Sequence, residues 1–260
     1  MQGLTNKVAL VTGAARGIGF SIASRLAQEG AHTILTDISN HVSQSYKKIK
    51  AAFRDNMGFG ALMDVTQKNE IHAVVEQILS KLGRVDILVN NAGILLQDLV
   101  LDTTEEKWDL SMNVNTKSVF LCSQAVLPHM INQKNGCIVN IASQAGKCAE
   151  VGISGYCTSK AAVIRLTQCI ALEMVEHNIR VNCVCPGATE TDLVKKVFRE
   201  RSKVLGISPE QMKRQFLEEI PMKRMAVPED IANVVAFLTS DESAYMTGQA
   251  LNVTGGRICY

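Results

Sequence analysis

The chain has 260 residues, of which 27 are Lys or Arg and 25 are Asp or Glu, and its formal net charge is +2. Because basic and acidic residues nearly balance, there is no electrostatic reason to expect nucleic acid or an anionic membrane as a partner. No apolar run approaches the roughly 18 to 20 residues of a membrane helix. The N-terminus lacks the pattern of a signal peptide, so we expect a cytoplasmic protein that folds as one α/β domain over residues 1–260.

The eight cysteines include no C-x-x-C pair and lie in apolar segments, which indicates buried, reduced thiols. The five histidines show none of the spacings of a metal site. We therefore expect neither disulfides nor a bound metal.

A short apolar run over residues 7–12 predicts the first strand, and an amphipathic stretch to Gln28 predicts the first helix. The glycine-rich turn Gly13-Ala-Ala-Arg-Gly17-Ile-Gly19 lies between them. Glycines at such a junction let the backbone approach a ligand closely, and the N–H groups at the start of the helix favour a phosphate. A turn with a purely structural role would look the same, but a position between strand and helix is what dinucleotide binding requires.

The next predicted strand, over residues 30–37, ends in Asp37. A carboxylate at this position can accept hydrogen bonds from the adenosine ribose hydroxyls and would repel a 2′-phosphate. The alternative is that Asp37 caps the helix that begins near Asn40. Arg16 in the glycine turn could reach a 2′-phosphate, but Asp37 would be closer and Ile38 carries no charge, so we expect NAD in preference to NADP.

Strands and helices alternate through the rest of the chain, and the strands are apolar, which predicts a parallel sheet with helices on both faces. Ligands bind such a sheet at the carboxyl ends of its strands, where Asp64-Val65 and Asn91-Ala92-Gly93 are expected. Further strands are predicted at 58–64, 85–89, 136–143, 179–185 and 247–253, and helices at about 40–55, 67–82, 103–130, 155–177 and 228–239.

Three segments carry an additional signal. Asn113 and Asn115 place amides in the middle of the helix expected at 103–130, where they lower helix stability unless they are used. The segment 192–227 has no place in the alternation, and we interpret it as a lid over the site, the alternative being a solvated insertion. The helix at 155–177 is apolar nearly all round after Lys160, which indicates burial against another subunit.

Ser143, Tyr156 and Lys160 form the cluster whose spacing suggests chemistry. Tyr156 and Lys160 are four residues apart, so on a helix they share one face, and Ser143 would reach the same point from the end of a strand. An ammonium beside a phenol favours the phenolate, which lowers the tyrosine pKa from about 10 towards neutrality. Removing hydride from a carbinol carbon requires the hydroxyl proton to leave at nearly the same time, and such a phenolate can accept it.

Six motifs occur in order: Thr12-Gly13-Ala-Ala-Arg-Gly17-Ile-Gly19, Asn90-Asn91-Ala92-Gly93, Asn115, Ser143, Tyr156-(x3)-Lys160 and Pro186-Gly187-(x3)-Thr191. In these motifs and their spacing the chain resembles the short-chain dehydrogenase/reductase family over essentially its whole length. The resemblance implies a Rossmann-type, doubly wound, seven-stranded parallel sheet with helices on both faces. It also implies a nicotinamide cofactor and assembly as a homotetramer.

The resemblance further implies roles for the matching residues. Tyr156 would be the general acid/base, Lys160 would lower its pKa and bind the nicotinamide ribose, and Ser143 would hydrogen-bond the reacting oxygen. Asn115 would hold a water relay that ends at Lys160. The cofactor would contact Gly13, Arg16, Gly17, Ile18, Gly19, Asp37, Asp64, Val65, Asn91, Ala92, Gly93, Tyr156, Lys160, Pro186, Gly187, Thr189 and Thr191.

The substrate is expected to contact Gln144 and Glu150 in addition to Ser143 and Tyr156. These polar groups suit a hydroxyl-rich ligand, and the run from Ser143 to Glu150 is similar to family members that act on sugar alcohols. We therefore expect a NAD-dependent polyol dehydrogenase. An NADP-dependent carbonyl reductase acting on an oxoacyl thioester, a diketone or a hydroxysteroid stays open, whereas a non-catalytic regulator would not need all four catalytic residues.

Overall fold

The computed structural model describes the backbone of residues 1–260 and the side chains of all but residues 201 and 203–205. One sheet contains the strands β1 (Val8–Thr12), β2 (His32–Asp37), β3 (Phe59–Leu62), β4 (Ile87–Asn90), β5 (Gly136–Ile141), β6 (Ile179–Pro186) and β7 (Ala250–Val253). The strand order is β3-β2-β1-β4-β5-β6-β7, and every neighbouring pair is parallel. The expected seven-stranded parallel sheet is confirmed.

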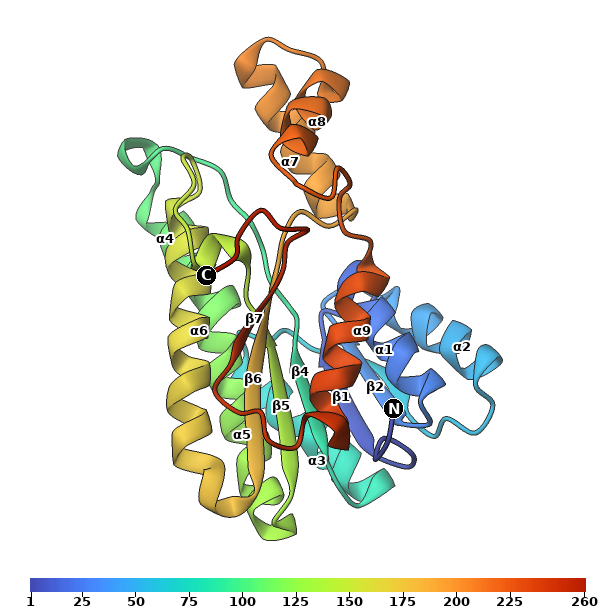
Figure 1. The fold of residues 1–260 in the computed structure, drawn as a ribbon. Helices are drawn as coiled ribbons and strands as arrows, with labels where there is room; N and C mark the ends of the chain where they lie inside the picture. Colours follow the sequence, from blue (N-terminus) through green and yellow to red (C-terminus); the bar gives the residue numbers. More distant parts are fainter.

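The α-helices are α1 (Gly17–Gln28), α2 (Val42–Ala52), α3 (Lys68–Leu82), α4 (Glu105–Met112), α5 (Ser118–Gln133), α6 (Ser154–Met174), α7 (Asp192–Leu205), α8 (Pro209–Glu218) and α9 (Pro228–Thr239). Helices α1, α2 and α9 pack on one face of the sheet, and α3, α5 and α6 pack on the other (Figure 1). Helices α7 and α8 stand beyond the edge at which the strands end, on the side of the C-terminal tail. The doubly wound arrangement is therefore confirmed.

The central strands supply side chains to both layers, because successive side chains point to opposite faces of a sheet. Ala9 and Val11 of β1 belong to the core beneath α1 and α9, whereas Val8 and Leu10 belong to the core beneath α3 and α5. This two-sided burial is why the strands are almost continuously apolar in sequence. The strand order reverses between β1 and β4, and in sheets of this kind ligands bind at that point.

The single helix expected at 103–130 is divided in the structure. Helix α4 begins after Thr104, whose hydroxyl accepts a hydrogen bond from the backbone N–H of Lys107 at 3.4 Å. Residues Asn113–Lys117 then form a π-helical turn before α5. A π turn breaks the regular α-helical hydrogen-bond pattern and is frequent at functional sites, so the two amides fall where the helix is least regular.

The segment 192–227 contains α7 and α8, which have a small core of their own. Phe198, Met212 and Met225 are buried in it, and the rings of Phe198 and Phe216 lie 5.3 Å apart. This core is separate from the two cores that cover the sheet. The segment does not continue the alternation of strands and helices, because its helices pack against each other and form a core of their own.

Candidate functional site

The turns after β1 and β4 are joined where the strand order reverses. The hydroxyl oxygen of Thr12 accepts hydrogen bonds from the backbone N–H groups of Asn91 at 3.0 Å and Ala92 at 3.1 Å. The Asn91 side-chain amide donates to the carbonyls of Thr12 at 2.8 Å and Gly13 at 2.9 Å. Gly13 has a φ of +62°, and a Cβ there would lie 2.8 Å from the Ala92 Cα, so a side chain would not fit. The structure thus brings together two of the segments predicted to bind the cofactor.

The N-terminus of α1 faces the turn that follows β6. A Cβ placed on Gly17 would have the Thr191 Cγ2 as its nearest neighbour, at 3.5 Å. Ile18 packs against the core, and Gly19 is buried close to the carbonyl of Gly13. The backbone can therefore approach a ligand closely at the start of a helix, where N–H groups favour a phosphate. The observed cradle fits the pyrophosphate of a dinucleotide.

Asp37 lies at the end of β2, beside the glycine turn. One carboxylate oxygen accepts a hydrogen bond from the Ala15 N–H at 3.1 Å and the other accepts a backbone N–H at 2.9 Å. Each oxygen keeps a lone pair for a further donor. Asp37 does not cap α2, whose N-cap is His41. The Arg16 guanidinium pairs with Asp192 of α7 at 3.3 Å.

Asp64 and Val65 follow β3, as predicted. Asp64 accepts a hydrogen bond from the Thr66 N–H at 2.9 Å, and Val65 is buried. A groove of about 690 Å³ opens here, and its lining includes the exposed Ile38 and Asp64. An apolar wall beside a carboxylate can accommodate a heteroaromatic ring that carries an amino group.

Hydroxyl groups order the turn that follows Pro186 at the end of β6. The Gly187 N–H donates to the Val253 carbonyl at 2.9 Å. The Thr189 hydroxyl donates to the Gly187 carbonyl at 3.1 Å, and the Thr191 hydroxyl donates to the Thr189 carbonyl at 3.3 Å. The turn is therefore held in the crevice next to Gly17.

Tyr156 lies in the first turn of α6, and Ser143 follows β5. The Ser143 hydroxyl accepts a hydrogen bond from the Ala145 N–H at 3.1 Å and lies beside the Tyr156 phenol. Burial raises the pKa of Tyr156 to about 12, and the neighbouring Ser143 hydroxyl offsets only part of this rise. The structure thus brings together a pair predicted from residues thirteen positions apart.

Lys160 lies one turn after Tyr156, but its ammonium points to the backbone. Its Nζ donates to the Ile141 carbonyl at 2.8 Å and lies 5.9 Å from the centre of the Tyr156 ring. Burial lowers the pKa of Lys160 to about 8. In this structure burial, and not Lys160, dominates the pKa of Tyr156, and the direction is opposite to the lowering that the sequence led us to expect.

Asn115 is fully buried in the π turn. Its side-chain oxygen accepts from the Ile94 N–H at 2.8 Å, and its amide donates to the Ile94 carbonyl and to the Ser159 hydroxyl, both at 3.0 Å. A Cβ placed on Gly93 would lie 3.2 Å from the Asn115 Oδ1 and 3.4 Å from the Lys160 Nζ. Asn115 and Lys160 therefore flank the same point, and Gly93 leaves room there.

Gln144 and Glu150 contact each other on the far side of Ser143. The Gln144 Nε2 donates to the Glu150 Oε1 at 3.1 Å, and the same oxygen accepts from Arg257 at 3.2 Å. Gln144 is 5% exposed, and its Oε1 has no partner among the side chains and backbone that the structure describes. A Cβ on Gly187 would lie 3.2 Å from that oxygen.

Two residues that contribute contacts to the site were not predicted from the sequence. Ser159 lies three residues after Tyr156, and this spacing on a helix could have indicated that the two side chains are neighbours. Arg257 has no such local signal, because its partners Glu150 and Glu219 are 107 and 38 residues away.

The eight cysteines are free thiols, but Cys169 and Cys259 are exposed, contrary to the expectation of buried thiols. Within the described residues, no three His, Cys, Asp or Glu side chains are grouped as a metal site requires. In the same part of the chain, no helix has the length and apolar character of a membrane span.

A family model described as enoyl-(acyl carrier protein) reductase matches residues 13–257. The 3-oxoacyl-(acyl-carrier-protein) reductase FabG of Thermotoga maritima is 42% identical over 255 residues, which cover 98% of this chain and 99% of that protein. A variant of actinorhodin polyketide ketoreductase, solved with NADPH, superposes with a TM-score of 0.94 at 34% identity over 100% of both chains. An NAD⁺-bound xylitol dehydrogenase superposes with a TM-score of 0.91 at 33% identity over 98% of this chain and 100% of that one.

These matches extend over nearly the whole chain and agree with the parallel sheet and the crevice at its switch point. They show an oxidoreductase that uses a nicotinamide cofactor to interconvert hydroxyl and carbonyl groups. The chain belongs to the short-chain dehydrogenase/reductase family.

Proposed function

We propose that the protein interconverts 3-oxoacyl and 3-hydroxyacyl thioesters with NAD(H). The observation that carries the proposed chemistry is the placement of the Ser143 hydroxyl beside the Tyr156 phenol at the carboxyl ends of the strands. The thioester class is supported by the 42% identity to a 3-oxoacyl reductase. The choice of NAD(H) is supported by Asp37 beside the glycine turn.

The bound nicotinamide cofactor would supply or accept the hydride. Gly13, Gly17 and Gly19 would bind its pyrophosphate through the N-terminus of α1, and Asp37 would accept hydrogen bonds from the adenosine ribose. The segments 64–65, 91–93 and 186–191 would hold the adenine, the central part and the nicotinamide amide. Lys160 would contact the nicotinamide ribose.

Tyr156 is suited to donate a proton to the carbonyl oxygen as the hydride arrives at carbon. Its raised pKa keeps the phenol protonated at neutral pH, which is the form that carbonyl reduction needs. The Ser143 hydroxyl would hydrogen-bond the same oxygen and hold it against Tyr156. In the oxidation direction Tyr156 must lose its proton, and a protonated Lys160 favours that phenolate. The raised pKa therefore supports reduction as the easier direction.

After donating, Tyr156 must regain a proton. Lys160 has a pKa of about 8, so it can exchange a proton near neutral pH. Asn115 and Lys160 meet beside Gly93, where a water relay could reach the ammonium. We propose that Asn115 positions this relay.

The structure weakens the argument for a polyol substrate. That expectation required polar groups to face the substrate, yet Gln144 and Glu150 bind each other. Lys147 donates to the carbonyls of Ala250 at 2.9 Å and Tyr260 at 3.1 Å. The Lys147 ammonium and the Glu150 Oε1 are thus bound to protein partners, and of these groups only the Gln144 oxygen has no partner in the part of the chain that the structure describes. One free acceptor matches the several hydroxyls of a sugar alcohol poorly, so the thioester reductase becomes the better-supported alternative.

Asp37→Ala tests the cofactor assignment. Loss of the carboxylate removes both the ribose acceptor and the repulsion of a 2′-phosphate, so the ratio of kcat/KM for NADPH to that for NADH should rise at least about tenfold. Arg16→Met, which leaves the Asp37 contacts in place, should not raise this ratio, because it removes a cation that could reach a 2′-phosphate. An unchanged ratio in Asp37→Ala would remove Asp37 from the cofactor site.

A cofactor-by-substrate panel tests the function as a whole. NADH and NADPH are each combined with 3-oxoacyl thioesters, diketones and ketosteroids, and NAD and NADP with 3-hydroxyacyl thioesters and xylitol. The highest kcat/KM is expected for 3-oxoacyl thioesters with NADH. A higher value for xylitol would restore the polyol hypothesis, and a preference for NADPH would reject the cofactor assignment.

A further inference from the structure

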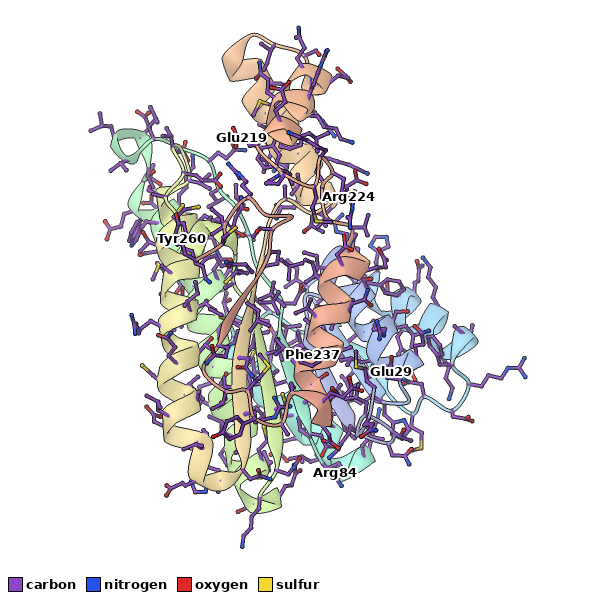
Figure 2. The ribbon with its side chains drawn as sticks, in the orientation of Figure 1. Glu29, Arg84, Glu219, Arg224, Phe237 and Tyr260 are labelled. Carbon is purple, nitrogen blue, oxygen red and sulfur yellow. The ribbon has the colours of Figure 1, made fainter. Side chains whose placement is uncertain are left out.

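Arg257, in the C-terminal tail, joins two segments that are far apart in the sequence. One guanidinium nitrogen donates to Glu150 at 3.2 Å, and another donates to Glu219, directly after α8, at 2.7 Å. The guanidinium carbon lies 4.7 Å from the centre of the Phe216 ring on α8. Arg257 is 19% exposed, and Figure 2 shows Glu219 at the base of the projecting helices. The tail thus ties α8 to the loop that follows β5.

This contact decides which way the Gln144 amide faces. The Glu150 Oε1 accepts both Arg257 and the Gln144 Nε2. An ionised carboxylate only accepts, so Gln144 must present its NH₂ group to Glu150 and its oxygen to the opposite side. That oxygen is buried near Gly187 and is unpartnered among the described atoms. A buried acceptor of this kind favours a ligand that brings a donor.

Among the described side chains, this contact is a less exposed ion-pair link between the α7–α8 segment and the site than the pair between Arg16 and Asp192. Arg257 is 19% exposed, Glu150 is 20% and Glu219 is 57%, and the guanidinium also stacks on Phe216. The pair between Arg16 and Asp192 is 80% and 66% exposed. Exposed pairs contribute little, whereas a guanidinium that bridges two carboxylates and stacks on a ring is held more firmly.

We propose that Arg257 is a positioning residue that couples α8 to the substrate side of the site. Through Glu219 it holds α8 in place, and through Glu150 it directs the Gln144 oxygen at a hydrogen-bond donor on the substrate. An amide N–H, as in the pantetheine arm of an acyl thioester, is a donor of this kind. Only this choice of donor rests on the proposed function.

Arg257→Met tests the coupling, because it keeps an apolar stem of similar length and removes the guanidinium. The KM for the best substrate of the panel should rise about tenfold, the size of one lost hydrogen bond, while kcat changes less. Trypsin should cleave more rapidly within 192–219, which contains Lys195, Lys196 and Arg199. The Kd for NADH, measured by fluorescence titration, should not change.

Arg224→Met is the matched control, because Arg224 pairs with Asp230 at 2.6 Å on the connection from α8 to α9 (Figure 2). It should leave KM and tryptic cleavage as in the wild type. Glu219→Gln should speed cleavage without lowering the melting temperature much, and it carries the test if Arg257→Met folds poorly. Arg257→Lys should restore the wild-type KM and the resistance to trypsin only in part. A single ammonium cannot replace a guanidinium that donates to Glu150 and Glu219 through two nitrogens.

Unchanged KM and unchanged cleavage in Arg257→Met would overturn the proposal. Gln144→Leu tests whether the donor that binds the Gln144 oxygen belongs to the substrate or to the cofactor. A raised KM for the substrate supports the proposal. A raised Kd for NADH shows that the oxygen binds the cofactor, and this result overturns the proposal. The cleavage and NADH measurements need no carbonyl substrate. Failure of the thioester hypothesis would therefore leave them interpretable.

Discussion

Two ionisable side chains lie one turn apart on α6, and burial moves their pKa values in opposite directions. The pKa of Tyr156 rises to about 12 and that of Lys160 falls to about 8. Both shifts have one physical cause, since a low-dielectric site disfavours whichever form is charged. A neutral phenol beside an amine that titrates near neutrality is a suitable pair for donating a proton and replacing it.

Tyr156→Phe should abolish turnover while NADH binding survives. The ring and its packing are kept, and only the hydroxyl that donates the proton is removed. We expect kcat to fall by about 10²- to 10⁴-fold, the usual contribution of general acid–base catalysis. Steady-state rates and a fluorescence titration with NADH measure the two effects. Turnover near the wild-type level would reject Tyr156 as the acid/base.

Lys160→Met should reveal the cost of burying the ammonium. The pKa of Lys160 is about 8 in the folded protein against an ordinary 10.5, so the unfolded chain binds more protons between these values. Wild-type stability relative to Lys160→Met should therefore rise by up to about 3 kcal/mol as the pH goes from 8 to 10.5. Below pH 8 the difference should be constant. Urea unfolding of both proteins at several pH values measures it, and a difference independent of pH would contradict the shift.

At the scale of elements, the π turn between α4 and α5 places the Asn115 amide against two other segments of the chain. Asn115 contacts Ile94 after β4 and Ser159 on α6. Asn115→Ala would leave the partly buried Ile94 N–H without its side-chain acceptor, so the free energy of unfolding should fall by about 1 to 3 kcal/mol, and kcat should fall with it. Asn113→Ala in the same turn is the control. Equal effects of the two substitutions would show that the turn, and not the Asn115 amide, is what matters.

The α7–α8 segment is the other element that the site depends on. Its small core around Phe198 and Met212 lets it hold its own shape, and Arg257 links it to the loop after β5. We propose that it is the lid over the substrate, as its sequence led us to expect. Faster tryptic cleavage in Arg257→Met would support this role.

At the scale of the whole molecule, apolar side chains remain exposed on α5 and α6. Phe120 is 44% exposed and Leu172 is 78% exposed, and Val175 follows α6 at 59%. Such residues gathered on two long helices suit an interface between subunits, so we propose a homotetramer. Leu172→Glu should lower the mass measured by light scattering, whereas Leu101→Glu, at a residue 96% exposed near α4, should not. A wild-type monomer would refute assembly.

The fold was predictable because its signals are local. Apolar runs such as 7–12, the glycine turn and the periodicity at 67–82 each depend on a few neighbouring residues, and a parallel sheet follows from their alternation. Ser143 and Tyr156 were also found by spacing, whereas Asn115 was singled out as an amide in the middle of a predicted helix and its role was implied by the family resemblance. The division of the helix at 103–130 was not predicted, because the π turn is stabilised by contacts that Asn115 makes with other segments.

The sequence by itself determined the sheet, the cofactor turn and the Ser143, Tyr156 and Lys160 cluster, because spacing along a helix and position at a strand end decide which side chains can meet. Only the tertiary structure decided the environment of these groups. Burial, which depends on the whole core, raised the pKa of Tyr156 where the local pattern predicted a lower value. The link from Glu150 through Arg257 to Glu219 likewise exists only because folding brings the tail between two distant segments.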